Sequence, residues 1–255
     1  MRKFLPKIFI SLFFPSFFLY ANPADTTIKK IYIGFTYSKE IFPESWQPSP
    51  INAAGEPIVE SEISRSKLAI IKALDKYPVD MLQQNIRAVY FLKSMQFFGV
   101  RYGATNSRDA VYISNNGVTL GYTDFYLEKS FHHEFSSILF RNYPSSLDTI
   151  EWKKANANDF DYNDPEKGVG AIRGKKSSED PDTVLAKFGL LTQYAMSSLE
   201  NDINTIAQNL FLPDNDFWSI TDHYPLIKKK VKLLIAFYNS INPVFTEQYF
   251  RKFQL

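Results

Sequence analysis

The stretch Ser130-Phe-His-His-Glu-Phe-Ser-Ser-Ile-Leu139 decides how this 255-residue chain is interpreted. On a helix, side chains three and four positions apart share a face. One face then gathers the apolar side chains of a core stripe, namely Phe131, Phe135, Ile138 and Leu139. His132 falls beside that stripe, whereas His133 and Ser137 lie together on the far side with Glu134 next to them. The stretch predicts a helix with one face in the core and one face that carries candidate catalytic or metal-binding side chains.

The far side of this helix resembles half of a zinc site. A zinc hydrolase helix presents H-E-x-x-H, two imidazole ligands one turn apart with a glutamate that takes a proton from the metal-bound water. Here the five positions read His133-Glu134-Phe-Ser-Ser137. A serine hydroxyl is a poor zinc ligand beside imidazole, thiolate or carboxylate. The motif therefore supplies one ligand and a base, and lacks the second histidine.

A second informative stretch runs from Gly189 to Phe211 and predicts an amphipathic helix in its second half. Glu200 borders the apolar stripe, Asn204 follows one turn later on the same flank, and Asp202 borders the opposite flank. A carboxylate backed by an amide can be a metal ligand with a supporting partner. An acid early in a helix can also do no more than stabilise the helix dipole. The sequence leaves both interpretations open.

Together these stretches resemble the zinc-binding metallopeptidases of the zincin class, more narrowly the gluzincins. The resemblance rests on the strand-like Ala110–Ser114, the His-His-Glu-Phe helix and the later Tyr-Ala-x-Ser-Ser-x-Glu run, and it covers roughly residues 86–211. It implies an α+β, zincin-like fold, with a small mixed sheet over an active-site helix and a helical C-terminal part.

The resemblance also implies roles for individual residues. His133 and Glu200 would bind Zn²⁺, Glu134 would be the general base, and Tyr194 would donate a hydrogen bond to the oxyanion. The chain departs from the family at the metal. Serine replaces the second histidine, amides stand where the family often carries acids, and a third ligand has to come from elsewhere; the residues concerned are Ser137, Asn204, Gln208, Asp202 and His223.

The rest of the chain predicts strands first and helices later, which favours an α+β fold. The expected strands cover residues 28–35, 86–91 and 111–114, with a loop over 99–109. The expected helices cover 64–77, 79–85, 127–142, one or two helices within 183–211, and 224–238, with a long polar loop over 144–182.

The first 21 residues have the layout of a secretory signal peptide, with Arg2, Lys3 and Lys7 ahead of an apolar run that is short for a membrane span. Residues 22–255 are then expected to form a single domain, exported to the periplasm or secreted, without a stable membrane span. Removing the leader leaves 26 basic and 27 acidic residues. Such a balance gives no electrostatic footprint for nucleic acid.

Two hypotheses about function follow. The chain is an exported zinc metallopeptidase-like enzyme that hydrolyses peptides with Glu134 as base, or it is a catalytically inactive zincin-fold protein that binds or scaffolds a peptide or protein. Other chemistries lack their motifs: the chain contains no cysteine, no G-x-S-x-G and no G-x-x-x-x-G-K-[ST].

Overall fold

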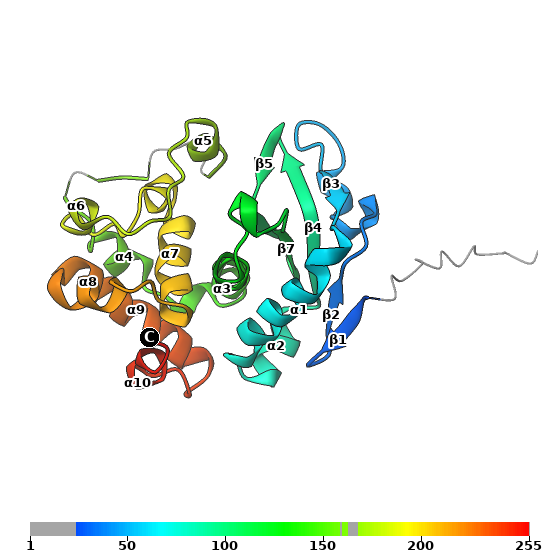
Figure 1. The fold of residues 1–255 in the computed structure, drawn as a ribbon. Helices are drawn as coiled ribbons and strands as arrows, with labels where there is room; N and C mark the ends of the chain where they lie inside the picture. Colours follow the sequence, from blue (N-terminus) through cyan, green and yellow to red (C-terminus); the bar gives the residue numbers. More distant parts are fainter. Residues whose placement is uncertain (1–23, 159, 163–167, 255) are drawn as a thin grey trace, which may run out of the picture.

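The computed structural model describes residues 24–158, 160–162 and 168–254, and in this part of the chain seven strands form one mixed sheet. The strands are β1 (Thr26–Ile28), β2 (Ile31–Gly34), β3 (Ala54–Pro57), β4 (Ala88–Phe97), β5 (Val100–Tyr102), β6 (Ala104–Asn106) and β7 (Ala110–Ser114). The order is β1-β2-β4-β7-β6, and β3 and β5 pair with the far half of the long strand β4. Figure 1 shows the sheet on one side, most of the later helices on the other, and α3 (Asp124–Asn142) between them. The chain is therefore α+β.

The two central strands are covered on both faces, which explains their nearly uninterrupted apolar sequences. Because side chains alternate along a strand, Val89, Phe91 and Val111 face the helices and belong to the main core. Tyr90 and Tyr112 face the other way and pack in a second cluster beneath the segment that precedes β3. Strands β4 and β7 run parallel, as strands buried on both sides often do.

Two parts of the sheet differ from the sequence prediction. The single strand expected over 28–35 is an antiparallel hairpin of β1 and β2, in which Lys29 and Lys30 have φ of 51° and 67°. A two-residue hairpin turn needs positive φ at both positions, usually from Asn and Gly, so lysines gave no turn signal. The loop expected over 99–109 contains β5 and β6, which are three residues each and so too short for an alternating pattern to be recognised.

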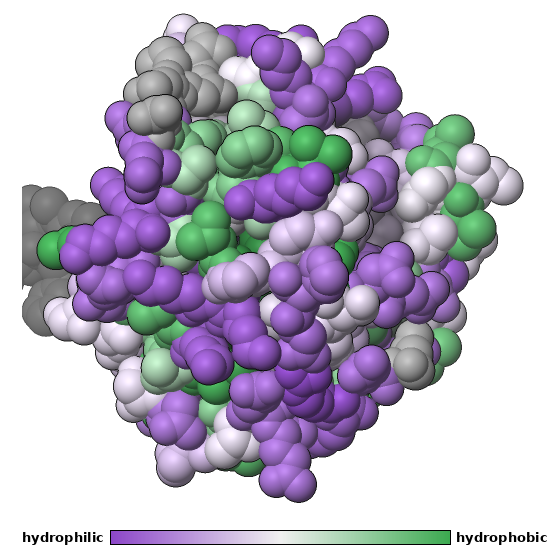
Figure 2. All heavy atoms as spheres, turned by 90° about the vertical axis from the view of Figure 1, so that its left-hand side faces the viewer, coloured by the Kyte–Doolittle hydropathy of each residue, from purple (hydrophilic) through white to green (hydrophobic). Residues whose placement is uncertain are grey.

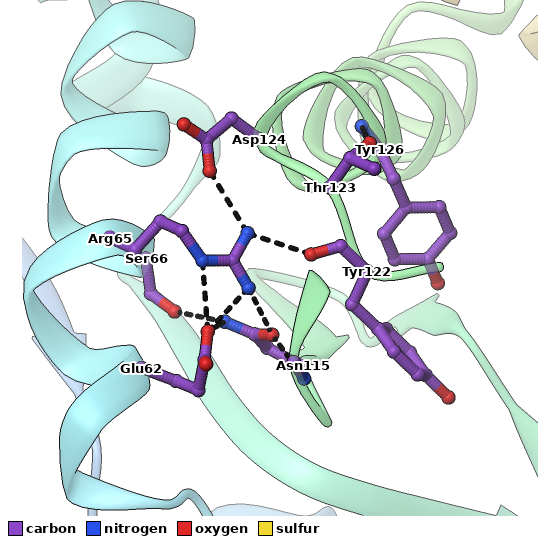
Figure 3. Close-up of polar contacts among 9 residues, drawn as sticks. Glu62, Arg65, Ser66, Asn115, Tyr122, Thr123, Asp124 and Tyr126 are labelled. Carbon is purple, nitrogen blue, oxygen red and sulfur yellow. Dashed lines mark hydrogen bonds and ion pairs between the residues drawn. The ribbon is translucent and has the colours of Figure 1, made fainter. Parts of the chain in front are cut away.

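Helices α1 (Glu60–Asp75) and α2 (Val79–Asn85) lie beside the sheet, and α1 packs against α3. An arginine fixes this packing at the start of α3. The Arg65 guanidinium donates to the Tyr122 carbonyl at 2.7 Å, to Asp124 at 2.9 Å and to Asn115 at 2.8 Å, and also bonds Glu62 (Figure 3). The charge on one side chain thereby joins α1, the end of β7 and the first turn of α3.

The second half of the described chain is helical. Its helices are α4 (Thr149–Lys153), α5 (Gly168–Arg173), α6 (Thr183–Ala186), α7 (Leu199–Phe211), α8 (Phe217–His223), α9 (Pro225–Ile241) and α10 (Glu247–Arg251). Helix α7 packs lengthwise on α3, and Phe211 at its end contacts the rings of Tyr77, Tyr238 and Phe250. The outward face of this half is largely hydrophilic, with separate smaller hydrophobic areas (Figure 2).

The predicted helices correspond to observed ones, but the loop expected over 144–182 contains two further short helices, α4 and α5. Helix α2 has the expected bounds, α3 begins three residues before the expected 127, and α9 extends beyond the expected end at 238. The stretch 183–211 contains α6, a 3-10 turn at Tyr194–Ser197 and α7, with Gly189 at a φ of 85° between them. The positive φ takes the chain out of the helical path, and a Cβ at Gly189 would lie 2.0 Å from the Ala155 carbonyl oxygen, so this position requires glycine.

The predicted leader, residues 1–21, lies outside the described residues. Across the described ranges, none of the helices combines the length and the apolar character that crossing a membrane requires.

Candidate functional site

A cavity of about 550 Å³ opens where the edge strand β6 passes over α3. Residues of β6, α3, α5, α7 and the turn before α7 line it, and they include Asn106, His133, Glu134, Ser137, Tyr194, Glu200 and Asn204. The far side of the motif helix, as expected from the sequence, therefore faces a cavity, while His132 on the other side is fully buried. Helix α7 supplies the opposite wall.

His133 is held by a chain of hydrogen bonds that fixes its tautomer. Gln208 Nε2 donates a hydrogen bond to the Glu179 carboxylate at 3.0 Å. The other atom of the same amide, Gln208 Oε1, therefore lies toward His133 Nδ1, at 2.7 Å. An amide oxygen only accepts, so Nδ1 carries the proton and the lone pair is on Nε2. The Tyr194 ring stacks on the imidazole with centroids 5.9 Å apart.

Glu134 lies 8% exposed beside His133 and accepts a hydrogen bond from Asn106 of β6. Burial raises the pKa of Glu134 above its ordinary value, and the nearby carboxylates of Glu200 and Glu179 add to the shift. The other end of the Asn106 amide bonds Arg141. The general base of the sequence hypothesis is therefore in the cavity, in a position that favours its neutral form.

Asn204 and Ser137 form the second contact between the two walls. The Asn204 Nδ2 donates to Ser137 Oγ at 2.6 Å, one helical turn from the Gln208–His133 bond. Asn204 is 1% exposed, and its Oδ1 has no hydrogen-bond partner in the described part of the chain. Helices α3 and α7 thus meet through two hydrogen-bonded pairs of polar side chains. Along each helix the two residues involved are four positions apart, which places them on neighbouring turns of one face.

Glu200 lies at the rim rather than beside His133. Its Oε1 is 3.1 Å from Arg141 Nη1, and both side chains are more than a third exposed. Arg141 also donates to the Ser107 carbonyl at 2.9 Å. One turn of α7 separates Glu200 from the Asn204–Ser137 pair, so the structure pairs Glu200 with a cation rather than with the imidazole.

The two other candidate ligands point elsewhere. Asp202 is on the opposite side of α7 and lies 2.6 Å from the ammonium of Lys230. His223 is the last residue of α8, where its ring contacts Tyr224. Neither lines the cavity.

Tyr194 is beside His133, and its position depends on a close approach of α5. A Cβ at Gly168 would lie 2.5 Å from the Tyr194 hydroxyl oxygen, so a larger residue there would displace the Tyr194 side chain. Burial raises the pKa of Tyr194, and the charge of Glu134 contributes in the same direction. The hydroxyl is therefore a neutral hydrogen-bond donor in this cavity.

The donor set does not fit zinc. A catalytic zinc site needs three protein ligands drawn from His, Cys, Asp and Glu, and within the described residues no three such side chains come together to hold a metal ion. One helical turn along the cavity wall from His133 stand a hydroxyl and a neutral amide, Ser137 and Asn204, which are hydrogen-bonded to each other.

The residues that the sequence analysis undervalued are the amides. Asn106, Asn204 and Gln208 make the contacts that orient Glu134, Ser137 and His133. Their one sequence signal was the spacing of Asn204 and Gln208, one turn apart on the flank of Glu200. Comparison with protein-family models, with curated proteins and with solved structures finds no match to this chain.

Proposed function

We propose that the protein is a binding protein that holds an extended peptide segment in the cavity between β6, α3 and α7, without a catalytic metal. The observation that carries this proposal is the cavity of about 550 Å³ beside the edge strand β6, whose lining includes Asn204. The Oδ1 of this residue is buried and has no hydrogen-bond partner in the described part of the chain. A buried acceptor without a partner costs about 1–3 kcal/mol, which a bound donor would recover. Because this oxygen is out of contact with solvent, a ligand donor bonds it only when the Asn204 side chain turns toward the cavity.

The edge of β6 supplies the backbone contacts. In the ladder with β7, Ser114 N donates to the Gly103 carbonyl and Ser107 N donates to the Ala110 carbonyl. Because hydrogen-bonded pairs alternate along an antiparallel ladder, the N–H and C=O groups of Ala104 and Asn106 face away from β7. Both residues line the cavity. A peptide added as a further strand would pair with these groups, as in other cases of β-augmentation.

The charges of the cavity indicate the side chain that the peptide presents. His133, Asn204, Glu134 and Glu179 lie on the same lining, and a cation bound among them would favour the ionised form of the Glu134 carboxyl against its burial. A donor-rich cationic side chain, lysine or arginine, satisfies such a set. The lining also contains two arginines, Arg101 and Arg141, and the second of these is already paired with Glu200.

The resemblance to zincins supports the same arrangement, since it implies an active-site helix beneath a sheet. The proposal corresponds to the second of the two functional hypotheses, the zincin-fold protein that binds without turnover. Peptide hydrolysis with Glu134 as base stays a prediction that depends on a metal, and the donor set around His133 gives it no support.

The experiment is selection of peptides from a phage-displayed library of random heptapeptides on the immobilised chain, followed by fluorescence polarisation with the selected peptide. We expect enrichment of peptides that contain lysine or arginine. Ala104→Pro removes one outward N–H of β6 without breaking a ladder bond, so it should weaken binding about tenfold or more. The matched control Thr105→Ala keeps the backbone donors and should bind as the unchanged chain does. No enrichment, or equal binding by both variants, would contradict the proposal.

A further inference from the structure

A buried trio of reactive side chains lies behind α7, away from the cavity. The ammonium nitrogen of Lys230 in α9 is 2.6 Å from Asp202 Oδ2 in α7 and 2.5 Å from Asn156 Oδ1, just after α4. It also donates to the Gly189 carbonyl at 2.6 Å. Lys230 and Asp202 are fully buried and Asn156 is 5% exposed. An amine, a carboxylate and a carboxamide are thus enclosed together out of contact with solvent.

Aromatic groups complete the enclosure and connect its members. The Trp152 indole donates to Asp202 Oδ2 at 2.7 Å, and the Lys230 nitrogen lies 5.4 Å from the centre of its ring system. The Tyr162 hydroxyl donates to the same Asp202 oxygen at 2.5 Å and accepts from Asn156 Nδ2 at 3.0 Å. A continuous hydrogen-bonded path therefore runs from the lysine through the aspartate and the tyrosine to the nitrogen of the carboxamide.

We propose that this trio is a self-modification site, at which Lys230 Nζ and Asn156 Cγ form an intramolecular amide bond. The nitrogen already contacts the carboxamide, and held reactants at this separation need little further approach. The arrangement provides a nucleophile, a base and an acid for the leaving group, which together define acyl transfer from a carboxamide to an amine.

The step balances without any co-reactant. Asp202 takes a proton from the Lys230 ammonium, and the free amine attacks Asn156 Cγ to form the new C–N bond. The bond from Cγ to Nδ2 breaks, and Tyr162 passes protons from Asp202 to the departing nitrogen. Lys230 loses two protons and the leaving group gains both, so ammonium departs and Asp202 and Tyr162 are restored. Nothing is oxidised or reduced.

Two further observations favour this bond. Burial lowers the pKa of Lys230, with the Asp202 charge acting against the shift, so the neutral amine is more accessible than in water. Asp202 Oδ1 has no hydrogen-bond partner among the described residues, so the carboxylate has an open position for a proton. The cross-link would span 74 residues in a chain that contains no cysteine, and closing a long loop restricts the unfolded chain most.

The test is peptide mapping by mass spectrometry of the full chain after denaturation. We expect a branched peptide that joins the segments around Asn156 and Lys230, lighter than its two linear components by about 17 Da, the mass of ammonia. Finding both segments only as linear peptides of unchanged mass would overturn the proposal. A loss of about 18 Da that maps to Asp202 and Lys230 would also overturn it, because that bond expels water from a different acyl group.

Variants separate the parts of the site. Lys229→Arg changes the neighbouring, partly exposed lysine, which pairs with Glu151, and should keep the branched peptide. Lys230→Arg should abolish it. Tyr162→Phe keeps the ring but removes the proton path, so the branched fraction should accumulate more slowly after synthesis. Full cross-linking at an unchanged rate in Tyr162→Phe would contradict the proposed path, and the mapping of the unchanged chain decides the bond itself even where a variant does not fold.

Discussion

The buried polar side chains on the two sides of α7 differ in charge and in the partners they bond. Toward the helices behind it, Asp202 is fully buried and forms an ion pair with Lys230 at 2.6 Å. Toward the cavity, two positions along, Asn204 is neutral, bonds a serine hydroxyl and leaves its carbonyl oxygen unpartnered. Both side chains are buried and each keeps one oxygen without a partner in the described part of the chain, but only Asp202 has a counter-charge and only Asn204 belongs to the cavity wall. The comparison indicates that the acid holds the fold and the amide is available for recognition.

The largest expected effect comes from the charged side. Asp202→Asn leaves the Lys230 ammonium buried without its counter-charge, so we expect a loss of about 3–5 kcal/mol in the free energy of unfolding. Chemical denaturation measures it, with Asn156→Ala in both chains so that the proposed cross-link cannot contribute. The control is Glu200→Gln on the same helix, whose exposed ion pair with Arg141 should contribute about 1 kcal/mol or less. Equal losses in the two variants would remove the distinction between the two sides.

The same contrast exists across α3 and predicts a pH dependence. Burial lowers the pKa of His132 from 6.5 to about 4, so the unfolded chain binds more protons between these values. Stability from His132 is present above pH 6.5 and is lost as the pH falls toward 4, by up to about 1.4 kcal/mol per pH unit. The free energy of unfolding of His132→Gln, measured by denaturation from pH 4 to 7, should depend less on pH than that of the unchanged chain. An unchanged slope would show that His132 is not the group that titrates.

Glu134, on the cavity side of α3, should act with the opposite sign. Its folded-state pKa is raised, so the folded chain binds more protons above pH 4.5 and the stability from the neutral carboxyl is lost as the pH rises. Glu134→Gln removes that loss and should raise stability at neutral pH relative to the unchanged chain. A decrease in stability at pH 7 would instead indicate that the hydrogen bond from Asn106 to the ionised carboxylate dominates.

The smallest effect on stability is expected at the cavity amide. Asn204→Leu removes a buried acceptor that has no partner, and the bond it gives up is worth about 1 kcal/mol. The free energy of unfolding should therefore change by about 1 kcal/mol or less, in either direction, in thermal and chemical denaturation. A loss as large as that of Asp202→Asn would mean that Asn204 supports the fold rather than a ligand.

The fold was predictable where hydrophobic periodicity is long and continuous. Helices α2, α3, α7 and α9 and the strands β4 and β7 follow from spacing alone. The short strands β5 and β6 were missed because three residues are too few to establish a pattern, and only pairing with β4 and β7 makes them strands. Helices α8 and α10, of seven and five residues, were also missed, because two turns or fewer are too short to establish a helical pattern.

The candidate site was predictable on one wall only. The motif placed His133, Glu134 and Ser137 on one face of α3, and they line the cavity together. The residues opposite were harder, because sequence analysis for a metal ranks acids above amides and so favoured Glu200 and Asp202. In the structure Glu200 pairs with Arg141, 59 residues away, and Asp202 pairs with Lys230, 28 residues away. Only the folded chain brings these partners together.

The most direct test of the binding proposal is the affinity of the selected peptide for the unchanged chain and for Asn204→Leu, each in excess EDTA and in added zinc. We expect the unchanged chain to bind equally in both solutions, to leave the peptide intact, and to contain no stoichiometric zinc by elemental analysis. Asn204→Leu should bind about tenfold or more weakly. Binding that EDTA abolishes and zinc restores, together with cleavage of the peptide, would contradict a metal-free binding site and support a hydrolase.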